Sequence, residues 1–138
     1  MLNQEFPVQK SDEEWKENLT PEEYEIIRNH KTEKPFSSEL LSNKNDGKYH
    51  CVACGELLFD SGSKYDSGTG WPSFYEIATE GKIGTSVDTE LLLPRTEVHC
   101  NNCGAHLGHL FNDGPAPTNQ RYCINGTALS FKKDNQDQ

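Results

Sequence analysis

The chain has 138 residues, enough for one domain with a single modest core, so two large domains are excluded. Its net charge is −9 and no run of Lys and Arg concentrates positive charge, which argues against a nucleic-acid partner. No apolar stretch approaches the roughly 20 residues that span a bilayer, and the first residues lack the basic and apolar regions of a signal peptide. We therefore expect a cytoplasmic protein that binds neither membranes nor nucleic acids.

Two short helices are predicted at the N-terminus, near residues 12–18 and 21–30. Each is preceded by a capping-box pair, and these pairs are Ser11 with Glu14 and Thr20 with Glu23. We expect Trp15, Tyr24 and Ile27 to face the core and the acidic residues between them to be solvated.

From about Lys48 onward, short β-rich runs alternate with Gly, Asp, Ser and Pro, which is typical of a compact antiparallel sheet region. The runs are KYHCV, ELLFD, GWPSFYEIA, KIGTSVD, EVHC and YCINGTALSFK. Apart from the helical arm, no segment is set off by its composition. We therefore expect a single domain over residues 1–138, with a helical arm over about 9–31 and a β core over about 47–132.

Four of the five cysteines form two CxxC pairs, Cys51 with Cys54 and Cys100 with Cys103. This pattern is typical of a tetrahedral zinc site, in which each thiolate lies about 2.3 Å from the metal. Because four protein ligands leave no position for water or substrate, one such zinc ion per chain would be structural and would not be the catalyst. Two disulfides or unconnected thiols are the alternative, which a reducing compartment disfavours.

Both CxxC pairs lie in a short internal repeat, His50-Cys51-x-x-Cys54-Gly55 and His99-Cys100-x-x-Cys103-Gly104. The glycine after each second cysteine can adopt the positive φ that turns backbone amides toward the thiolates. His50 or His99 could replace a ligand, but four cysteines already complete the site. We therefore expect both histidines at the surface or beside the ligands.

Cys123 is the fifth cysteine, and by itself it could be a small buried hydrophobe or a reactive thiol. Strand periodicity places Arg121, Cys123 and Asn125 on one face, and Tyr122 and Ile124 on the other. A guanidinium beside the thiol would lower its pKa and favour the nucleophilic thiolate. An ordinary surface salt bridge is the alternative for Arg121.

His106 and His109 are three residues apart, and Gly108 between them favours a turn. We therefore expect both histidines on one side of a helical turn. Because histidine titrates near neutral pH, such a pair could donate or relay a proton. Two core histidines without a chemical role are the alternative.

The motifs KYHCVACGELLF, KYDSGTGWPSFYE, CGAHLGHLFNDGPAP and RYCINGTALSF together resemble the B-type methionine sulfoxide reductases, which reduce the R epimer of methionine sulfoxide in proteins. The resemblance extends from the N-terminal helices to Phe131. It implies a mainly β fold of two antiparallel sheets with short N-terminal helices, a structural zinc ion held by four cysteines, and a substrate pocket on the opposite side of the molecule. The protein would be an oxidoreductase for protein repair in the oxidative stress response.

The resemblance also assigns roles to residues at matching positions. The catalytic residues would be Cys123, His106, His109, Asn125 and Arg121, and the substrate-binding residues would be Trp71 and Phe111. The thiolate of Cys123 would attack the sulfoxide sulfur, a histidine would protonate the oxygen, and a sulfenic acid would form. Trp71 would pack on the methyl group of the sulfoxide, although it could also be a core residue that anchors the GWPSF turn.

The sequence departs from the family at Thr69, where many members carry a resolving cysteine. With four cysteines as ligands and Cys123 as nucleophile, no thiol remains for an intramolecular disulfide. We therefore expect an external thiol such as thioredoxin, glutaredoxin or glutathione to regenerate the enzyme, and oxidised proteins or peptides that contain methionine sulfoxide to be its substrates.

Two other functions fit parts of the sequence. A non-catalytic β module stabilised by zinc could bind a peptide or small molecule. In such a module Cys123 would be buried and its thiol would have an ordinary pKa. A zinc hydrolase or deaminase would need an open metal site and an acidic general base, and the H-x-E signature of deaminases is absent from the sequence.

Overall fold

The structure is a computed structural model that describes residues 6–88 and 95–134. Within these residues the helical segments are α1 (Asp12–Asn18), α2 (Pro21–Asn29) and the 3-10 helices η1 (Glu39–Ser42), η2 (Ser61–Ser63) and η3 (Gly126–Ala128). The strands are β1 (Gly47–Cys51), β2 (Leu57–Asp60), β3 (Lys64–Tyr65), β4 (Ser73–Phe74), β5 (Ile83–Asp88), β6 (Arg95–Cys100), β7 (His106–Phe111), β8 (Arg121–Ile124) and β9 (Leu129–Lys133). In the described part of the chain, no helix has the length and apolar character needed to cross a membrane.

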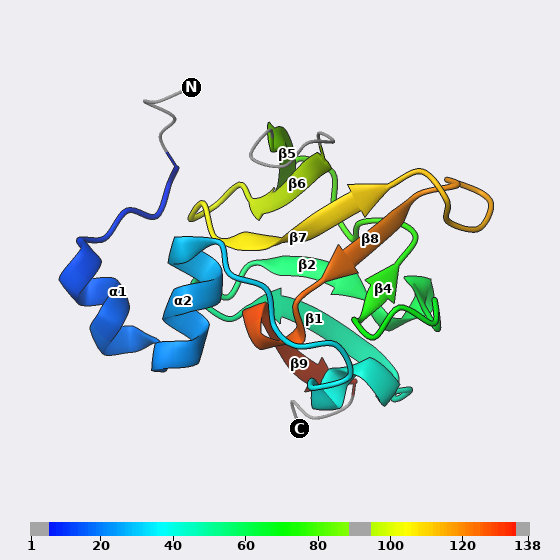
Figure 1. Cartoon of the computed structure of the whole chain (residues 1–138), viewed down its shortest axis with the longest axis horizontal. Helices are drawn as coiled ribbons and strands as arrows, with labels where there is room; N and C mark the ends of the chain where they lie inside the picture. The colour runs from blue at the N-terminus through cyan, green and yellow to red at the C-terminus, as the bar shows by residue number, and fades with distance from the viewer. Residues whose placement is uncertain (1–5, 89–94, 135–138) are drawn as a thin grey trace.

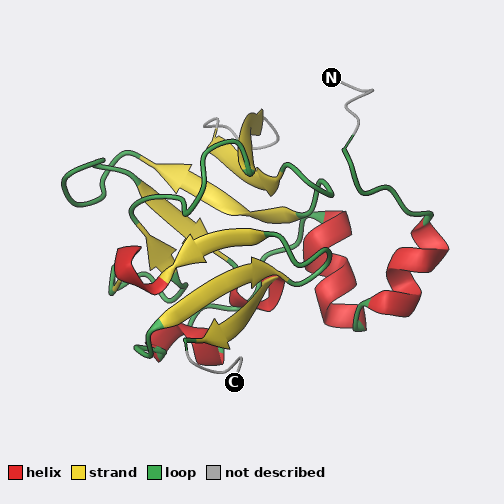
Figure 2. Cartoon of the chain, turned by 180° about the vertical axis from the view of Figure 1, so that it is seen from behind, coloured by secondary structure: helices red, strands yellow, loops and turns green. Residues whose placement is uncertain are grey.

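Both N-terminal helices begin where their capping boxes predict. The hydroxyls of Ser11 and Thr20 accept hydrogen bonds from the backbone three residues ahead, and the glutamates at those positions bond back. α2 ends one residue earlier than predicted, because His30 adopts a left-handed conformation with φ of 61°. Trp15 and Ile27 are buried as predicted. The two helices lie together at one side of the strands (Figures 1 and 2).

The strands form two antiparallel sheets, which confirms the expected fold class. One sheet has the order β2-β1-β9 and the other has the order β3-β4-β8-β7-β6-β5. β8, the strand of Cys123, therefore lies between β4 and β7 (Figure 1). η3 connects β8 to β9, so the chain passes from the larger sheet to the smaller sheet directly after Cys123.

A hydrophobic core joins the two sheets. Tyr49 of β1 and Phe59 of β2 pack against Phe74 of β4, with ring centroids 5.1 and 4.3 Å from that of Phe74. α2 packs against β7 and η3, and its Tyr24 is partly buried against the core. Because both sheets and α2 meet around β7 and β8, these two strands have a rigid support.

The segment that contains His106 and His109 is the strand β7, so the prediction of a helical turn is wrong. Pairing with β6 on one side and β8 on the other overrides the local preference of Gly108 for a turn. A β-bulge in the ladder pairs His106 with His99 and His109 with Glu97. Since these partners are two residues apart on β6, both histidines face the same side of the sheet. The two imidazoles are thus neighbours, as expected, but a β-bulge and not a helical turn brings them together.

Candidate active site and metal centre

The four paired cysteines converge on one point. The Sγ atoms of Cys51 and Cys103 are 3.7 Å apart, and those of Cys54 and Cys100 are also 3.7 Å apart. All four sulfurs lie within 4.8 Å of one another, and none is in a disulfide. Each short contact joins one CxxC pair to the other, which is the arrangement expected around a shared metal ion. The predicted four-cysteine cluster is therefore confirmed as a site that fits a metal.

The two halves of this cluster have the same backbone conformation. Gly55 and Gly104 have φ of 84° and 81°, as predicted, and each donates a 2.8 Å hydrogen bond to the carbonyl of the first cysteine in its pair. His50 lies beside the cluster, with Nδ1 3.1 Å from the carbonyl oxygen of Gly55, and His99 packs against a phenylalanine ring. Neither histidine belongs to the four-sulfur cluster.

A row of directly opposed residues crosses the larger sheet through Cys123. From β3 to β6 the row consists of Tyr65, Ser73, Cys123, His109 and Glu97. Opposed residues of antiparallel strands point to the same face, so the row gathers a phenol, a hydroxyl, a thiol, an imidazole and a carboxylate. Tyr122 and Ile124, which alternate with Cys123 along β8, are buried in the core.

A pocket of about 260 Å³ opens at this row. Its lining includes six of the predicted site residues, namely Cys123, His109, Arg121, Asn125, Trp71 and Phe111. His106 does not line the pocket and is only 1% exposed. The paired cysteines are also outside the lining, so the metal site and the thiol pocket are separate. A larger cavity of about 580 Å³ beside Phe36 has no thiol or imidazole in its lining.

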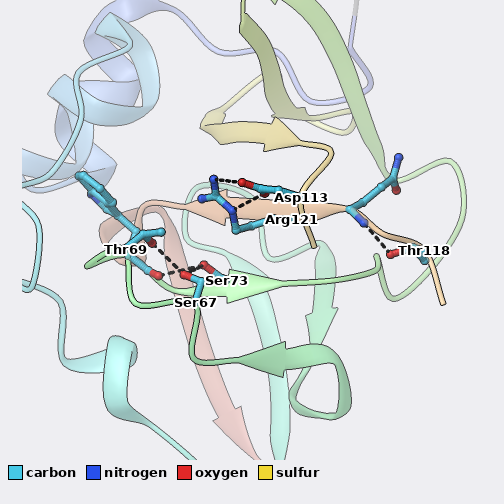
Figure 3. Close-up of polar contacts among 8 residues, drawn as sticks. Ser67, Thr69, Ser73, Asp113, Thr118 and Arg121 are labelled. Atoms are coloured by element: carbon cyan, nitrogen blue, oxygen red, sulfur yellow. Dashed lines mark hydrogen bonds and ion pairs between the residues drawn. The ribbon is translucent and has the colours of Figure 1, made fainter. Parts of the chain in front are cut away.

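Burial raises the pKa of the Cys123 thiol, and the nearby Arg121 and Thr69 lower that pKa by less. Arg121 lowers the pKa of the thiol, as expected, but burial outweighs this effect. Arg121 also binds Asp113, because its Nε and Nη2 donate to both carboxylate oxygens of Asp113 at 2.8 and 3.1 Å (Figure 3). Its guanidinium also lies 4.3 Å from the ring centre of Phe111.

Glu33 holds two pocket residues in place, a role that was not predicted from the sequence. Its backbone N–H donates to Asn125 Oδ1, and its carbonyl accepts from Trp71 Nε1, both at 3.0 Å. Its carboxylate is buried and accepts three hydrogen bonds of 2.8 to 2.9 Å from Gly126 and Thr127. An isolated glutamate in a loop normally indicates a solvated side chain, so no local signal could have identified it. The pocket residues that sequence reasoning did not assign to the site are Thr32, Thr69, Arg95 and Gly108.

His106 lies behind His109, against a shared carboxylate. Its Nδ1 is 2.6 Å from Glu97 Oε2, a close ionic contact without full hydrogen-bond geometry, and His30 Nδ1 lies 2.5 Å from the same oxygen. Burial raises the pKa of Glu97, but the two histidines outweigh burial and hold that pKa well below its usual range. These nitrogen–oxygen distances are shorter than the roughly 3.3 Å between ligands of a tetrahedral zinc ion, so the three side chains contact one another directly.

The ring centroids of His106 and His109 are 5.6 Å apart, in an edge-to-face arrangement. His109 is thus the histidine that reaches the pocket, and His106 contacts it from the buried side. The structure brings the predicted pair together but gives its two members different surroundings.

The fold and the site define a small β protein with a four-cysteine cluster that fits a metal ion and a separate pocket around one thiol. The SelR domain model matches residues 19–133, and the chain belongs to this family of oxidoreductases. It is 52% identical over 129 residues to a protein of Methanosarcina barkeri named peptide methionine sulfoxide reductase MsrB, covering 94% of this chain and 91% of that protein. Proteins of the same name from Leptospira interrogans and Escherichia coli are 50% and 51% identical, covering 94% and 88% of this chain and 98% and 88% of theirs. The predicted family is thereby confirmed.

Proposed function

We propose that the protein reduces methionine R-sulfoxide, mainly in peptides and proteins, with Cys123 as the nucleophile. The observation that carries this proposal is the direct opposition of Cys123 and His109 on adjacent strands, at a pocket that both residues line. The name that these relatives share, peptide methionine sulfoxide reductase, supports the substrate class. The R epimer follows from the family resemblance.

In the first step, the Cys123 thiolate attacks the sulfoxide sulfur and negative charge develops on the oxygen. His109 lines the pocket and donates a proton to that oxygen, while the buried His106 orients His109 from behind. One thiolate, one sulfoxide and one proton thus give methionine and a sulfenic acid at Cys123. The cysteine sulfur is oxidised and the methionine sulfur is reduced.

Trp71 and Phe111 supply the apolar part of the pocket. The indole N–H of Trp71 is bound to the Glu33 carbonyl, so the ring is fixed and its face can receive the methyl group of the substrate. Phe111 carries the Arg121 guanidinium on its ring, which places a cation near the developing oxyanion. Asn125 is held by Glu33 and by the Leu107 carbonyl, which it contacts at 3.1 Å, and it borders the nucleophile.

The metal in the four-cysteine site is, in our proposal, one structural zinc ion. Tetrahedral zinc with bonds of about 2.3 Å separates neighbouring sulfurs by about 3.8 Å, and two of the separations here are 3.7 Å. Cys51, Cys54, Cys100 and Cys103 would hold the ion and complete its coordination. Zinc would supply folding energy and take no part in sulfoxide reduction.

The sulfenic acid would be reduced by an external thiol. Thr69 lines the pocket at the position where the family often has its resolving cysteine, and the other four cysteines are gathered in the metal site. Two thiols of the reductant would give a disulfide, water and the regenerated Cys123 thiol. Thioredoxin, glutaredoxin and glutathione have this chemistry. Because these thiols are available in the cytoplasm, a cytoplasmic location of the protein is part of the proposal.

The test is epimer-resolved turnover by the zinc-loaded protein with a racemic methionine sulfoxide peptide and excess dithiothreitol. We expect loss of the R epimer alone, and no turnover by Cys123→Ser. Turnover of the S epimer, or full activity of Cys123→Ser, would contradict the proposal. Folded protein without any turnover would favour the binding module instead.

A further inference from the structure

Three hydroxyl groups connect the side of the pocket at Thr69 to the backbone beneath it. Ser67 Oγ lies 2.8 Å from Thr69 Oγ1 and 2.8 Å from Ser73 Oγ, and Ser73 Oγ donates to the carbonyl of Trp71 at 3.2 Å. Figure 3 shows the three hydroxyls directed toward one another. Ser73 is 1% exposed and is directly opposed to Cys123 across the β4–β8 ladder.

The chain of hydroxyls ends beside the nucleophile. Thr69 and Cys123 both line the pocket, and the nearby Thr69 side chain lowers the pKa of the Cys123 thiol. Three hydrogen bonds therefore run in series from Thr69 to the Trp71 carbonyl, with Cys123 beside the first hydroxyl.

The Trp71 carbonyl can only accept a hydrogen bond, so it sets the direction of this chain. With a neutral thiol, Ser73 donates to the carbonyl, Ser67 to Ser73 and Thr69 to Ser67, and the Thr69 oxygen is left to accept the proton of Cys123. A thiolate has no proton to donate, so Thr69 must turn its hydroxyl toward the sulfur. Ser67 can then donate to Thr69, and this polarises the Thr69 O–H toward the anion.

We propose that the hydroxyls of Thr69, Ser67 and Ser73 act as a reversible hydrogen-bond chain that stabilises the thiolate of Cys123. Thr69 is the donor to the sulfur, and Ser67 and Ser73 are positioning residues that act through Thr69. On ionisation the thiol proton leaves to solvent, and the hydroxyls rotate without any change in covalent bonding. The threonine at the resolving-cysteine position thus assists the nucleophile. The inference uses the proposed function in one respect, namely that Cys123 reacts as a thiolate.

Other charged or titratable groups also face this thiol from the surrounding elements, and any test must keep them constant. They are Arg121 on β8 with its partner Asp113, His109 on β7, Tyr65 on β3, Arg95 on β6 and Glu33 in the loop after α2. Substitutions at Thr69 and Ser67 leave all of these charges in place.

The experiment is the pH dependence of Cys123 alkylation by iodoacetamide in the zinc-loaded protein, followed by mass spectrometry of the peptide that contains Cys123. Thr69→Val keeps the side-chain shape without the hydroxyl, and we expect its midpoint to rise by about one pH unit, a tenfold loss of thiolate. Thr69→Ser should keep the wild-type midpoint. Ser67→Ala should raise the midpoint by a smaller amount, because Thr69 loses the group that polarises it.

Thr118→Val is the matched control, since the Thr118 hydroxyl bonds to the Tyr75 carbonyl and takes no part in the chain. Its midpoint should equal that of the wild type. An unchanged midpoint in Thr69→Val, or an equal shift in Thr69→Ser, would overturn the role of the Thr69 hydroxyl. An unchanged midpoint in Ser67→Ala would overturn the chain. Alkylation needs no turnover, so these results are independent of whether Cys123→Ser abolishes sulfoxide reduction.

Discussion

Replacement of Glu33 by glutamine tests whether one buried carboxylate supports the pocket. Glu33 is 4% exposed, and its two carboxylate oxygens accept hydrogen bonds from the N–H groups of Gly126 and Thr127 and from the Thr127 hydroxyl. Glutamine offers one oxygen and one NH₂ group, so at least one buried N–H would face another donor. Each lost charge-assisted bond costs about 1.5–3 kcal/mol, and an unsatisfied buried donor adds about 1–3 kcal/mol. We expect Glu33→Gln to lower the free energy of unfolding by about 3 kcal/mol.

Urea unfolding of the metal-loaded protein measures this loss. With a denaturant slope of about 1–3 kcal/mol per molar urea, the midpoint should fall by about 1 M or more. Glu17→Gln is the matched control, because Glu17 is exposed on α1 and its substitution should change stability by less than about 0.5 kcal/mol. Turnover should also fall in Glu33→Gln, since Trp71 and Asn125 depend on the Glu33 backbone. Equal midpoints for the two variants would show that the buried carboxylate of Glu33 does not stabilise the fold.

Three further predictions follow from the site. A Cβ on Gly108 would lie 2.0 Å from the Cys123 carbonyl oxygen, so Gly108→Ala should destabilise the protein by more than about 2 kcal/mol and abolish turnover. Gly62→Ala is the control for the same urea and activity assays, and it should do neither, because the nearest atom to its Cβ would lie at 3.3 Å. The histidines hold the pKa of Glu97 below its usual range, so its ionisation stabilises the fold above about pH 4.3 and this stability is lost as the pH falls. In acid titrations, the free energy of unfolding should therefore decline less steeply with falling pH for Glu97→Gln than for the wild type. An equal decline in the two proteins would contradict this prediction. A strong chelator should remove about 10–16 kcal/mol of metal-binding energy, which is more than most small domains can lose. Circular dichroism should then show unfolding of at least the region around the two CxxC pairs. An unchanged spectrum after verified metal loss would contradict a structural role for the metal.

Local chemistry explains which features could be predicted from the sequence. Capping boxes act within one turn of helix, so the first residues of α1 and α2 follow directly from four side chains. The CxxC pairs are equally local, because each loop presents two sulfurs through a glycine with positive φ. The face of β8 follows from the alternation of Tyr122, Cys123 and Ile124. In each case the residues that decide the structure are close in the chain.

The features that could not be predicted depend on distant partners. β7 is a strand because β6 and β8 flank it, and the bulge that aligns His106 with His109 arises in that pairing. Glu33 bonds to groups more than 90 residues away. The raised pKa of Cys123 reflects burial by several elements, which the neighbouring Arg121 could not reveal.

Oxidation of Cys123 by the substrate is tested most directly by a single turnover without reductant, using zinc-loaded protein, excess methionine R-sulfoxide peptide and dimedone as a trap for sulfenic acid. We predict about one methionine per chain, and a dimedone adduct on Cys123 in the same amount. Methionine formed without modification of Cys123 would contradict it, because the oxygen would then have left the substrate by another route.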